Sequence, residues 1–376
     1  MRSVLVVRLD SAGDVLLAGP AIRAVATVTD RVVLLTGPRG REAAGLLPCV
    51  DEIAVWCCPW IDPEPGPVRR GDVLAAAELV RRLRVDQAVI LTSFHQDPLP
   101  TALLLRLAGV PHITAASDDY PGSLLDVRHR LPDRGLHEVE RMVSVAAAAG
   151  FPPPADLRLR VRTPLPQAPV PWGMRGYVVA HPGASVPARA PLPQRSAQYV
   201  RALRLAGWPV AVTGTPGDSE LTSSTANGCA LDLAGKTTLA ELAALLARAA
   251  VLVTGNTGPA HLAAAVGTPV VSLFAPVVPL ERWRPWGVPH EVLGAQDAAC
   301  AGSRARTCPV PGHPCLAGVT ADEVAAAVRR LAGAPPAAPD PVTQGQAAGS
   351  PVSGPPVPHP TVPDPTTPDL TMGVRA

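Results

Sequence analysis

A chain of 376 residues is longer than one ordinary hydrophobic core requires, so its length predicts two domains of about 150 residues each plus additional sequence. The net charge is only +2 and aromatic residues make up 3% of the chain, so neither a basic groove for phosphates nor stacking platforms for bases stand out. These values argue against a nucleic-acid-binding protein.

Three features of the sequence bear on where the protein resides. The N-terminal apolar run, residues 4–7, is too short for a signal peptide and is followed by Arg8 and Asp10. Residues 249–280 lack Asp, Glu, Lys and Arg, but glycines and prolines divide them into short elements, so we expect no stable membrane span. The seven cysteines form no regular framework, which is typical of free thiols in a reducing compartment. Together these features predict a cytoplasmic protein.

In the first half, short apolar runs alternate with longer helical patterns, which predicts βαβ units and a parallel sheet. In chain order we expect a strand at 4–7 and a helix at 15–25, a strand at 32–35 and a helix at 39–47, a strand at 88–91 and a helix at 100–108, and a further helix at 137–150.

Prolines then interrupt the pattern, and the proline-rich run 163–172 is the best candidate for a linker. In the second half we expect strands at 177–180 and 210–213, with helices at 196–206, after Gly217 and at 238–249. The residues after 331 include almost no large apolar side chains, which predicts disorder. The predicted organisation is an α/β protein with an N-terminal domain at 1–165, a linker at 166–175, a C-terminal domain at 176–332 and a disordered tail at 333–376.

The pattern at residues 251–276 predicts a strand, a tight loop, a short helix and a second strand, joined by very short connections. Thr257 and Gly258 end the loop, and Gly267 stands where the C-terminus of the helix favours a positive φ. The free N–H groups at the start of this helix form a site for a phosphate or carboxylate, and His261 projects from the first turn. Ligands of open α/β sheets bind beyond the carboxyl ends of the strands, so we expect the site in a cleft between the two halves.

Asp14 lies between the first strand and the first helix, at a strand end that faces the predicted cleft. It is a candidate general base, but Asp at this place is also a common helix N-cap, and the residues alone leave both interpretations open. The surrounding loop matches neither the dinucleotide-binding fingerprint nor the P-loop, which argues against a dehydrogenase or a kinase.

The first strand of the second half is followed by a polar loop that contains His181, Gly183 and Ser185, with Arg189 close behind. A guanidinium there could contact a diphosphate in a bidentate way, although a solvated surface arginine is the simpler interpretation. After the next strand, Asp218 or Glu220 could accept hydrogen bonds from ribose hydroxyls, or could simply provide favourable charge at a helix N-terminus.

One loop of the second half is rich in potential metal ligands. Four side chains in the order Cys-x7-Cys-x4-His-x-Cys could close a tetrahedral zinc site, and free or packed thiols are the alternative: Cys300, Cys308, His313 and Cys315. The spacing matches no common structural zinc pattern, and no Asp-x-Asp metal clamp occurs in the chain. No metal or other cofactor needs to be invoked.

From residue 1 to about residue 332 the chain resembles glycosyltransferase family 9, the ADP-heptose:lipopolysaccharide heptosyltransferase family. The resemblance rests on the opening stretch 4–23, on His-Pro-Gly-Ala-Ser at 181–185, on Leu-Ala-Gly-Lys-Thr-Thr-Leu at 233–239 and on the Asn-Thr-Gly-Pro-Ala-His stretch at 256–269. It implies a GT-B fold, in which two Rossmann-like domains face each other across a cleft. The acceptor would be held mainly by the first domain and the nucleotide sugar by the second.

The resemblance also implies roles for individual residues in an inverting, metal-independent transfer. Asp14 falls on the general base of the family, Arg189 on its diphosphate-binding basic residue and Glu220 on its ribose-binding acid. The phosphate-holding loop falls on Thr257 and Gly258, with His261 beside them, and His181, Gly183 and Ser185 belong to the same donor site. Asn256 stands where the family commonly has Asp, which removes a negative charge beside the expected diphosphate.

The leading functional hypothesis is therefore a glycosyltransferase that moves a sugar, with heptose as a candidate, from an ADP-heptose-like nucleoside-diphosphate donor to the hydroxyl of a glycan, lipid-linked or small-molecule acceptor. The alternative is a nucleotide-sugar-binding module that has lost turnover. The presence of Asp14 together with Arg189 and the Thr-Gly-Pro loop at 257–259 favours the enzyme, because a binding module needs no base in the opposite domain. A related epimerase would need acidic groups around the sugar in the second half, and none is evident.

Overall fold

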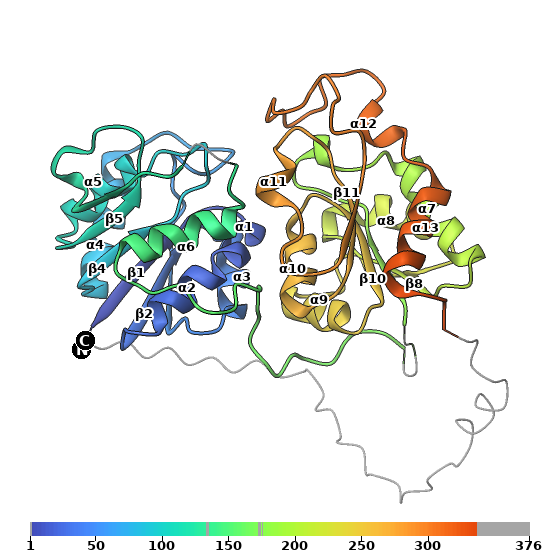
Figure 1. Ribbon diagram of the computed structural model, residues 1–376, viewed down its shortest axis with the longest axis horizontal. Helices are drawn as coiled ribbons and strands as arrows, with labels where there is room; N and C mark the ends of the chain where they lie inside the picture. The colour runs from blue at the N-terminus through green and yellow to red at the C-terminus, as the bar shows by residue number, and fades with distance from the viewer. Residues whose placement is uncertain (1, 133–134, 172–173, 175, 337–376) are drawn as a thin grey trace, which may run out of the picture. The chain divides into compact units, whose positions relative to one another are not determined.

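The computed structural model describes residues 2–132, 135–171, 174 and 176–336, in which two parallel six-stranded sheets are each flanked by helices (Figure 1). The predicted α/β class is thus confirmed. The part of the predicted tail from residue 337 onwards, and three residues of the predicted linker, lie outside the described residues.

The first sheet has the strand order β3-β2-β1-β4-β5-β6. Its strands are β1 (Ser3–Arg8), β2 (Arg31–Thr36), β3 (Glu52–Val55), β4 (Gln87–Ile90), β5 (Ile113–Ala116) and β6 (Val127–His129). The helices of this half are α1 (Ala12–Leu17), α2 (Gly19–Ala26), α3 (Arg41–Leu46), α4 (Arg70–Leu83), α5 (Leu99–Leu107) and α6 (Glu138–Ala148).

The second sheet repeats this topology with the order β12-β11-β10-β7-β8-β9. Its strands are β7 (Val178–His181), β8 (Val210–Val212), β9 (Leu231–Asp232), β10 (Val251–Gly255), β11 (Val270–Leu273) and β12 (His290–Leu293). The helices of this half are α7 (Pro193–Leu205), α8 (Ser219–Ala226), α9 (Leu239–Ala247), α10 (Gly258–Val266), α11 (Leu280–Trp283), α12 (Pro314–Ala317) and α13 (Ala321–Ala332).

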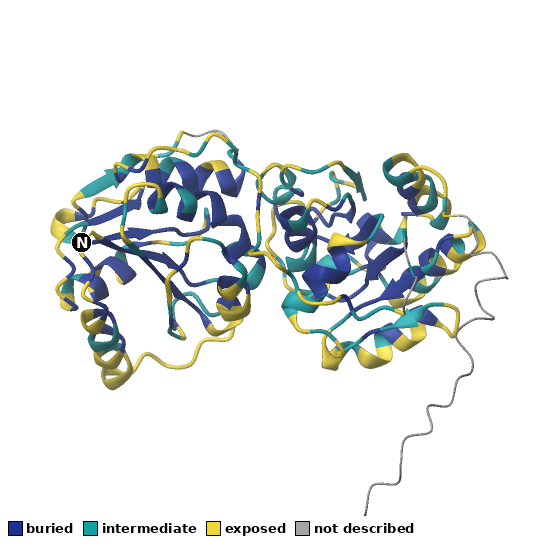
Figure 2. Cartoon of the chain, turned by 90° about the horizontal axis from the view of Figure 1, so that it is seen from below, coloured by how far each residue is buried: buried dark blue, intermediate teal, exposed yellow. Residues whose placement is uncertain are grey.

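The central strands are apolar on both faces because helices cover both faces of each sheet. Every residue of β1 is buried, and its side chains alternate between a core shared with α1, α2 and α6 and one shared with α4 and α5. Figure 2 shows the central strands in the buried colour and the outer faces of the helices in the exposed colour. The core around α1 and α2 continues through α10 and α9 into the second half, so residues of both sheets belong to one apolar cluster.

The strand order determines where a ligand can enter. In both sheets the order reverses beside the first strand of the half, between β1 and β4 and between β7 and β10. Chain connections leave these neighbouring strands in opposite directions, which opens a crevice at their carboxyl ends. Polar residues that directly follow β1, β4, β7 and β10 are therefore the candidates for a binding site.

The structure corrects one predicted helix. The single helix expected at 15–25 is two helices, because α1 ends at Leu17 and α2 begins at Gly19 with Pro20 in its first turn. Proline has no N–H to continue the hydrogen bonds of the preceding helix but suits the start of a new one. Gly267 has a φ of +85° just after α10, as predicted. Among the described residues, no helix is both long and apolar enough to cross a membrane.

The backbone around β10 leaves no room for a side chain at Gly255, where an added Cβ would collide with the carbonyl oxygen of Arg189. We expect Gly255→Ala to destabilise the protein by roughly 1–3 kcal/mol, because the strand or the Arg189 segment must shift. Differential scanning calorimetry should show a lower melting temperature. The matched control is Gly45→Ala on the exposed face of α3, where nothing lies within 4 Å of the added Cβ and alanine should be neutral or stabilising. A parental melting temperature for Gly255→Ala would contradict the tight packing.

Candidate functional site

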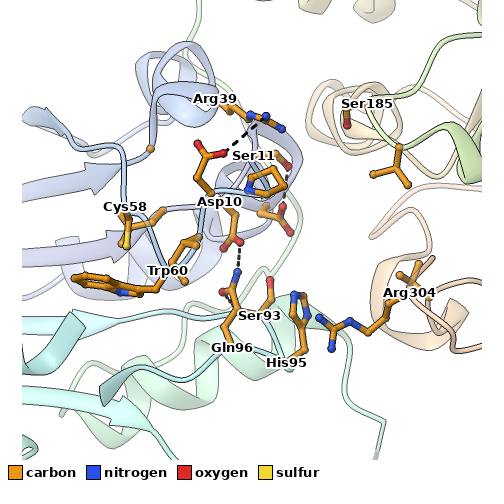
Figure 3. A pocket seen from close by; sticks show the side chains of 18 of the residues that line it. Asp10, Ser11, Arg39, Cys58, Trp60, Ser93, His95, Gln96, Ser185 and Arg304 are labelled. Atoms are coloured by element: carbon orange, nitrogen blue, oxygen red, sulfur yellow. Dashed lines mark hydrogen bonds and ion pairs between the residues drawn. The ribbon is translucent and has the colours of Figure 1, made fainter. Parts of the chain in front are cut away.

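A cavity of about 560 Å³ opens at the carboxyl ends of the central strands (Figure 3). Its lining comes mainly from the loops after β1, β2, β3 and β4 and from the second-half segments around Ser185, Arg189 and Arg304. It continues into a narrow recess of about 60 Å³, whose lining adds Gly13, Asn256, Gly258 and His261. We call these two spaces the main cavity and the recess.

The last residue of β1, Arg8, is fully buried beneath the main cavity. Its guanidinium donates to Oδ1 of Asp14 at 3.1 Å, to Oγ of Ser93 at 2.8 Å and to the carbonyl oxygen of Leu91 at 3.3 Å. Its Nε also lies 3.1 Å from Oδ2 of Asp10. A buried cation needs such partners, so Arg8 holds the loop after β1 against the loop after β4.

Asp14 is the third residue of α1, whereas Ser11 occupies the N-cap position. The interpretation of Asp14 as an N-cap is therefore wrong. Its carboxylate accepts from the Ser11 hydroxyl at 2.8 Å as well as from Arg8, and it borders both cavities. Burial alone would raise the pKa of Asp14, but Arg8, the Ser11 hydroxyl, His261 and Arg189 together hold it below its usual range. Asp14 is therefore ionised near neutral pH.

Asp10 is the second carboxylate beside Arg8, but its environment acts in the opposite direction. Burial raises the pKa of Asp10, and Asp14 adds to the effect, while Arg8 and the amide of Gln96 oppose it. Figure 3 shows Gln96 reaching from the loop after β4 to this carboxylate. Two carboxylates that share one guanidinium thus differ in proton affinity, and Asp14 is the stronger acid.

The N-termini of α1 and α10 meet at the recess. A Cβ at Gly13 would lie 3.0 Å from Cδ2 of His261 and 3.1 Å from Cα of Gly258, so only glycine at position 13 permits this approach. Thr257 is the N-cap of α10, and its side chain makes no capping hydrogen bond. Pro259 has no N–H, and the Ala260 N–H donates to the carbonyl oxygen of Thr257 at 3.1 Å, which leaves the Gly258 N–H for a ligand. This N–H group and the helix dipole favour an anion at this point.

Two buried nitrogens at the recess lack a hydrogen-bond partner among the described residues. One is Nδ1 of His261, which is 6% exposed, and the other is Nε of Arg189. Burial lowers the pKa of His261 to about 4, with Asp14 opposing and Arg189 contributing. Burial also lowers the pKa of Arg189. Because Arg189 lines both cavities, the interpretation as a solvated surface residue is wrong.

Asn256 anchors the loop before α10. Its Oδ1 accepts from the backbone N–H of Ala275 at 3.2 Å, and its Nδ2 donates to the carbonyl oxygen of Ala275 at 3.4 Å. An aspartate could accept the first of these hydrogen bonds but could not donate the second. The asparagine therefore ties the ends of β10 and β11 together while it borders the recess.

The remaining predicted donor residues occupy different environments. Ser185 lines both cavities, whereas His181 is buried beneath them and bonds to the Thr213 hydroxyl at 3.0 Å. A Cβ at Gly183 would lie 3.0 Å from the carboxylate of Asp218, which also accepts from the backbone N–H of Thr215. Glu220 is exposed and lines neither cavity. Of the two acids considered from the sequence, Asp218 is the one that faces the loop after β7.

The cysteine-rich loop shows no metal-binding geometry. Nowhere in the described ranges do three His, Cys, Asp or Glu side chains come together in a way that could hold a metal ion. Cys300 and Cys315 are packed in the apolar core of the second half, Cys308 lies against it, and His313 is buried nearby. Burial raises the pKa of the Cys315 thiol to about 11. The arrangement supports the alternative of packed thiols.

Several residues that line the main cavity were not predicted from the sequence. Ser93, His95 and Gln96 directly follow β4, and the change from a buried strand to polar residues was the available signal. Arg304 and Arg306 come from a long irregular loop, for which no pattern in the sequence predicts a position. Figure 3 shows the guanidinium of Arg304 directed toward His95.

Comparisons with known proteins agree with this architecture. A family model described as glycosyltransferase family 9 (heptosyltransferase) matches residues 76–313. Lipopolysaccharide heptosyltransferase 3 of Escherichia coli is 33% identical over 174 residues, which are 42% of this chain and 50% of that protein. The chain thus spans about half the length of this curated relative.

Solved structures show the same fold at lower identity. The family 9 glycosyltransferase of Veillonella parvula has a TM-score of 0.70 at 18% identity and covers 88% of this chain and 97% of that one. The Escherichia coli heptosyltransferase WaaC with ADP-2-deoxy-2-fluoro heptose has a TM-score of 0.65 at 18% identity. The match covers 87% of this chain and 99% of that one. The predicted GT-B fold is confirmed.

The position of Arg8 makes a prediction about stability. We expect Arg8→Met to lower the free energy of unfolding by roughly 3 kcal/mol at pH 7, because Asp10 and Asp14 lose their shared cation. The pKa of Asp14 is lowered in the fold, so its pairing contributes stability above the ordinary carboxyl value of about 4 and loses it as the pH falls further. The difference in the free energy of unfolding between parent and variant, measured by urea unfolding, should therefore decrease below about pH 4.

The control is Arg330→Met, which removes an arginine whose pairing with Glu291 is largely exposed and lies outside the cavity. Its effect on the free energy of unfolding should be far smaller than that of Arg8→Met, because solvent screens an exposed pair. If Arg8→Met loses as little free energy of unfolding as the control, or if its loss does not change with pH, the buried ion pair does not have this central role.

Proposed function

Because the chain belongs to glycosyltransferase family 9, the heptosyltransferases, we propose that it transfers a sugar, with heptose as the first candidate, from ADP or a similar nucleoside diphosphate to an acceptor hydroxyl. The observation that carries the proposal is the position of Asp14. This ionised carboxylate borders the main cavity and also contacts the recess where anion-binding groups gather.

The recess supports the donor side of the proposal. The Gly258 N–H at the start of α10 and the guanidinium of Arg189 offer positive charge to a diphosphate, and Ser185 adds a hydroxyl. With the diphosphate in the recess, the anomeric carbon of the donor sugar would lie next to Asp14. The same groups gain value as negative charge develops on the leaving diphosphate, so we propose a transfer that needs no metal ion.

The main cavity supports the acceptor side. An acceptor hydroxyl beside Asp14 attacks the anomeric carbon, its proton passes to the carboxylate, and the bond from that carbon to the diphosphate oxygen breaks. The nucleoside diphosphate leaves with the bonding electrons. A single displacement of this kind inverts the anomeric configuration. The lowered pKa makes Asp14 a weak base, which suits a transition state in which the acceptor oxygen has become acidic through bond formation.

The cavity also bears on the kind of acceptor. Trp60 and Phe94 offer apolar faces, while Gln96 and several arginines and carboxylates offer hydrogen bonds, a mixture that suits a glycan or other hydroxyl-rich molecule. The alternative function is a nucleotide-sugar-binding module without turnover. It would need the recess but not an ionised Asp14 held by Arg8, so the Arg8–Asp14 pair favours the enzyme.

The role of Asp14 gives a direct test. Asp14→Asn should lower kcat by roughly a hundredfold or more, because the amide cannot accept the acceptor proton, while ADP should still bind. Release of ADP from an ADP-heptose donor in the presence of acceptor measures turnover, and calorimetry measures binding. The matched control is Asp126→Asn, which removes a carboxylate paired with arginine outside the cavity and should retain parental turnover. Parental turnover in Asp14→Asn would exclude it as the base.

The role of Arg189 gives a second test. Arg189→Ala should weaken ADP binding and also lower kcat, since the guanidinium contacts the group that becomes more negative in the transition state. Arg189→Lys should be milder because it retains a positive charge. Arg201→Ala, an exposed arginine on α7, is the control that should bind ADP like the parent. Unchanged ADP affinity in Arg189→Ala would show that the diphosphate binds elsewhere.

A further inference from the structure

The recess contains a buried side chain whose hydrogen-bonding capacity is unused. His261 lies in the first turn of α10, lines the recess together with Thr257 and Gly258, and is 6% exposed. Its Nδ1 has no partner among the described residues. A buried polar group without a partner costs on the order of 1–3 kcal/mol, so an unpartnered ring that lines a cavity points to a ligand that completes its bonding.

Three titratable groups, each on a different element, surround this ring. Asp14 on α1 is negative, Arg189 in the short 3-10 turn Pro187–Arg189 is positive, and His137 at the start of α6 is a more distant neighbour that burial keeps neutral. Burial holds the pKa of His261 at about 4, so the ring of the free protein is neutral near pH 7. With one carboxylate and one guanidinium facing it, the ring lacks enough negative charge to become an imidazolium.

A diphosphate in the recess changes that balance. It brings two negative charges to the start of α10, next to the ring, and an opposite charge within about 4–6 Å raises the pKa of a histidine by roughly 1–3 units. It also gives the imidazolium an acceptor for its N–H group. From a value of about 4, such a shift brings the histidine to the edge of the neutral range.

We propose that His261 takes up a proton when the diphosphate of a nucleotide sugar binds in the recess, so that donor and proton bind cooperatively. This inference rests on the proposed function, because it takes the ligand to be a diphosphate. The resulting imidazolium donates a hydrogen bond to the diphosphate and places a second cation beside Arg189 where the leaving group becomes negative. The proton comes from solvent on binding and returns to solvent when the nucleoside diphosphate leaves.

Isothermal titration calorimetry with ADP-glucose tests the inference. Both phosphates of this probe are esterified, so it carries no phosphate group that titrates near neutral pH, and any proton taken up belongs to the protein. Titrations at pH 5.5 in buffers of low and high ionisation enthalpy should give a slope of about 0.2 or more protons taken up per molecule bound, as expected for a pKa raised from about 4 to between about 5 and 7. Since the bound histidine has the higher pKa, the uptake should decrease toward pH 8 and the affinity should fall as the pH rises.

Two variants and one spectrum separate this role from a structural one. His261→Asn should lose the uptake, whereas His95→Asn should retain it, because His95 lines the main cavity but not the recess. In the parent labelled with ¹³C-histidine, one ring signal should move toward the imidazolium position on addition of ADP-glucose at pH 5.5. This NMR measurement needs no variant, so it decides the question even where His261→Asn fails to fold.

The outcomes distinguish this inference from the proposed function. Binding of ADP-glucose without proton uptake, or undiminished uptake in His261→Asn, overturns the inference and leaves the proposed function standing. Failure of both ADP and ADP-glucose to bind overturns the proposed function and the inference with it. Uptake that disappears in His261→Asn, persists in His95→Asn and coincides with a new imidazolium signal supports the proposal.

Discussion

The guanidinium of Arg8 is the constraint around which the site is organised. A cation without solvent access must be surrounded by acceptors, and at the end of β1 these come from Asp10, Asp14 and the loop after β4. The loops on both sides of the topological switch point are thereby held together. An ionised Asp14 at the cavity wall follows from this arrangement, because its carboxylate shares the charge of Arg8.

The close approach of α1 and α10 is the second feature on which the site depends. Gly13 lets the two helix starts meet, so that the carboxylate of one half lies beside the Gly258 N–H of the other. Asp14 is then close to His261 and Arg189, which both lower its pKa, while Asp14 opposes the lowering of theirs by burial. The proposed displacement needs a carboxylate beside the group that holds the diphosphate, because the acceptor hydroxyl must reach the anomeric carbon next to it.

The cysteine-rich loop has a structural part in this arrangement. Its buried thiols pack in the core of the second half, and its backbone is tied to the site by bonds from Arg304 N–H to the carbonyl of Val277 and from Ala188 N–H to the carbonyl of Arg306. Arg304 has a left-handed φ of +59°, a conformation that costs energy for a non-glycine residue. The loop thereby brings two arginines, Arg304 and Arg306, to the wall of the main cavity.

Much of the fold could be predicted because its signals are local. The apolar runs of β1, β2 and β10, the glycine after α10 and the loop at 256–258 each depend on residues within a few positions of one another. The short edge strands β3 and β6 were not predicted, because three or four half-buried residues carry no clear alternation. Pro20 was present in the sequence, but the apolar periodicity around it continues through the break between α1 and α2.

The sequence by itself therefore determined the two α/β halves, the strand, loop and helix around α10, and the identity of Asp14 and Arg189 as candidates. Only the tertiary structure decided what these residues do to one another. Arg8 meets Ser93 across 85 positions of the chain, and Asp14 shares the recess with Arg189 and His261, which lie far along the sequence. Charge pairing, burial and proton affinity depend on distances in space, and these exist only once the two sheets have packed.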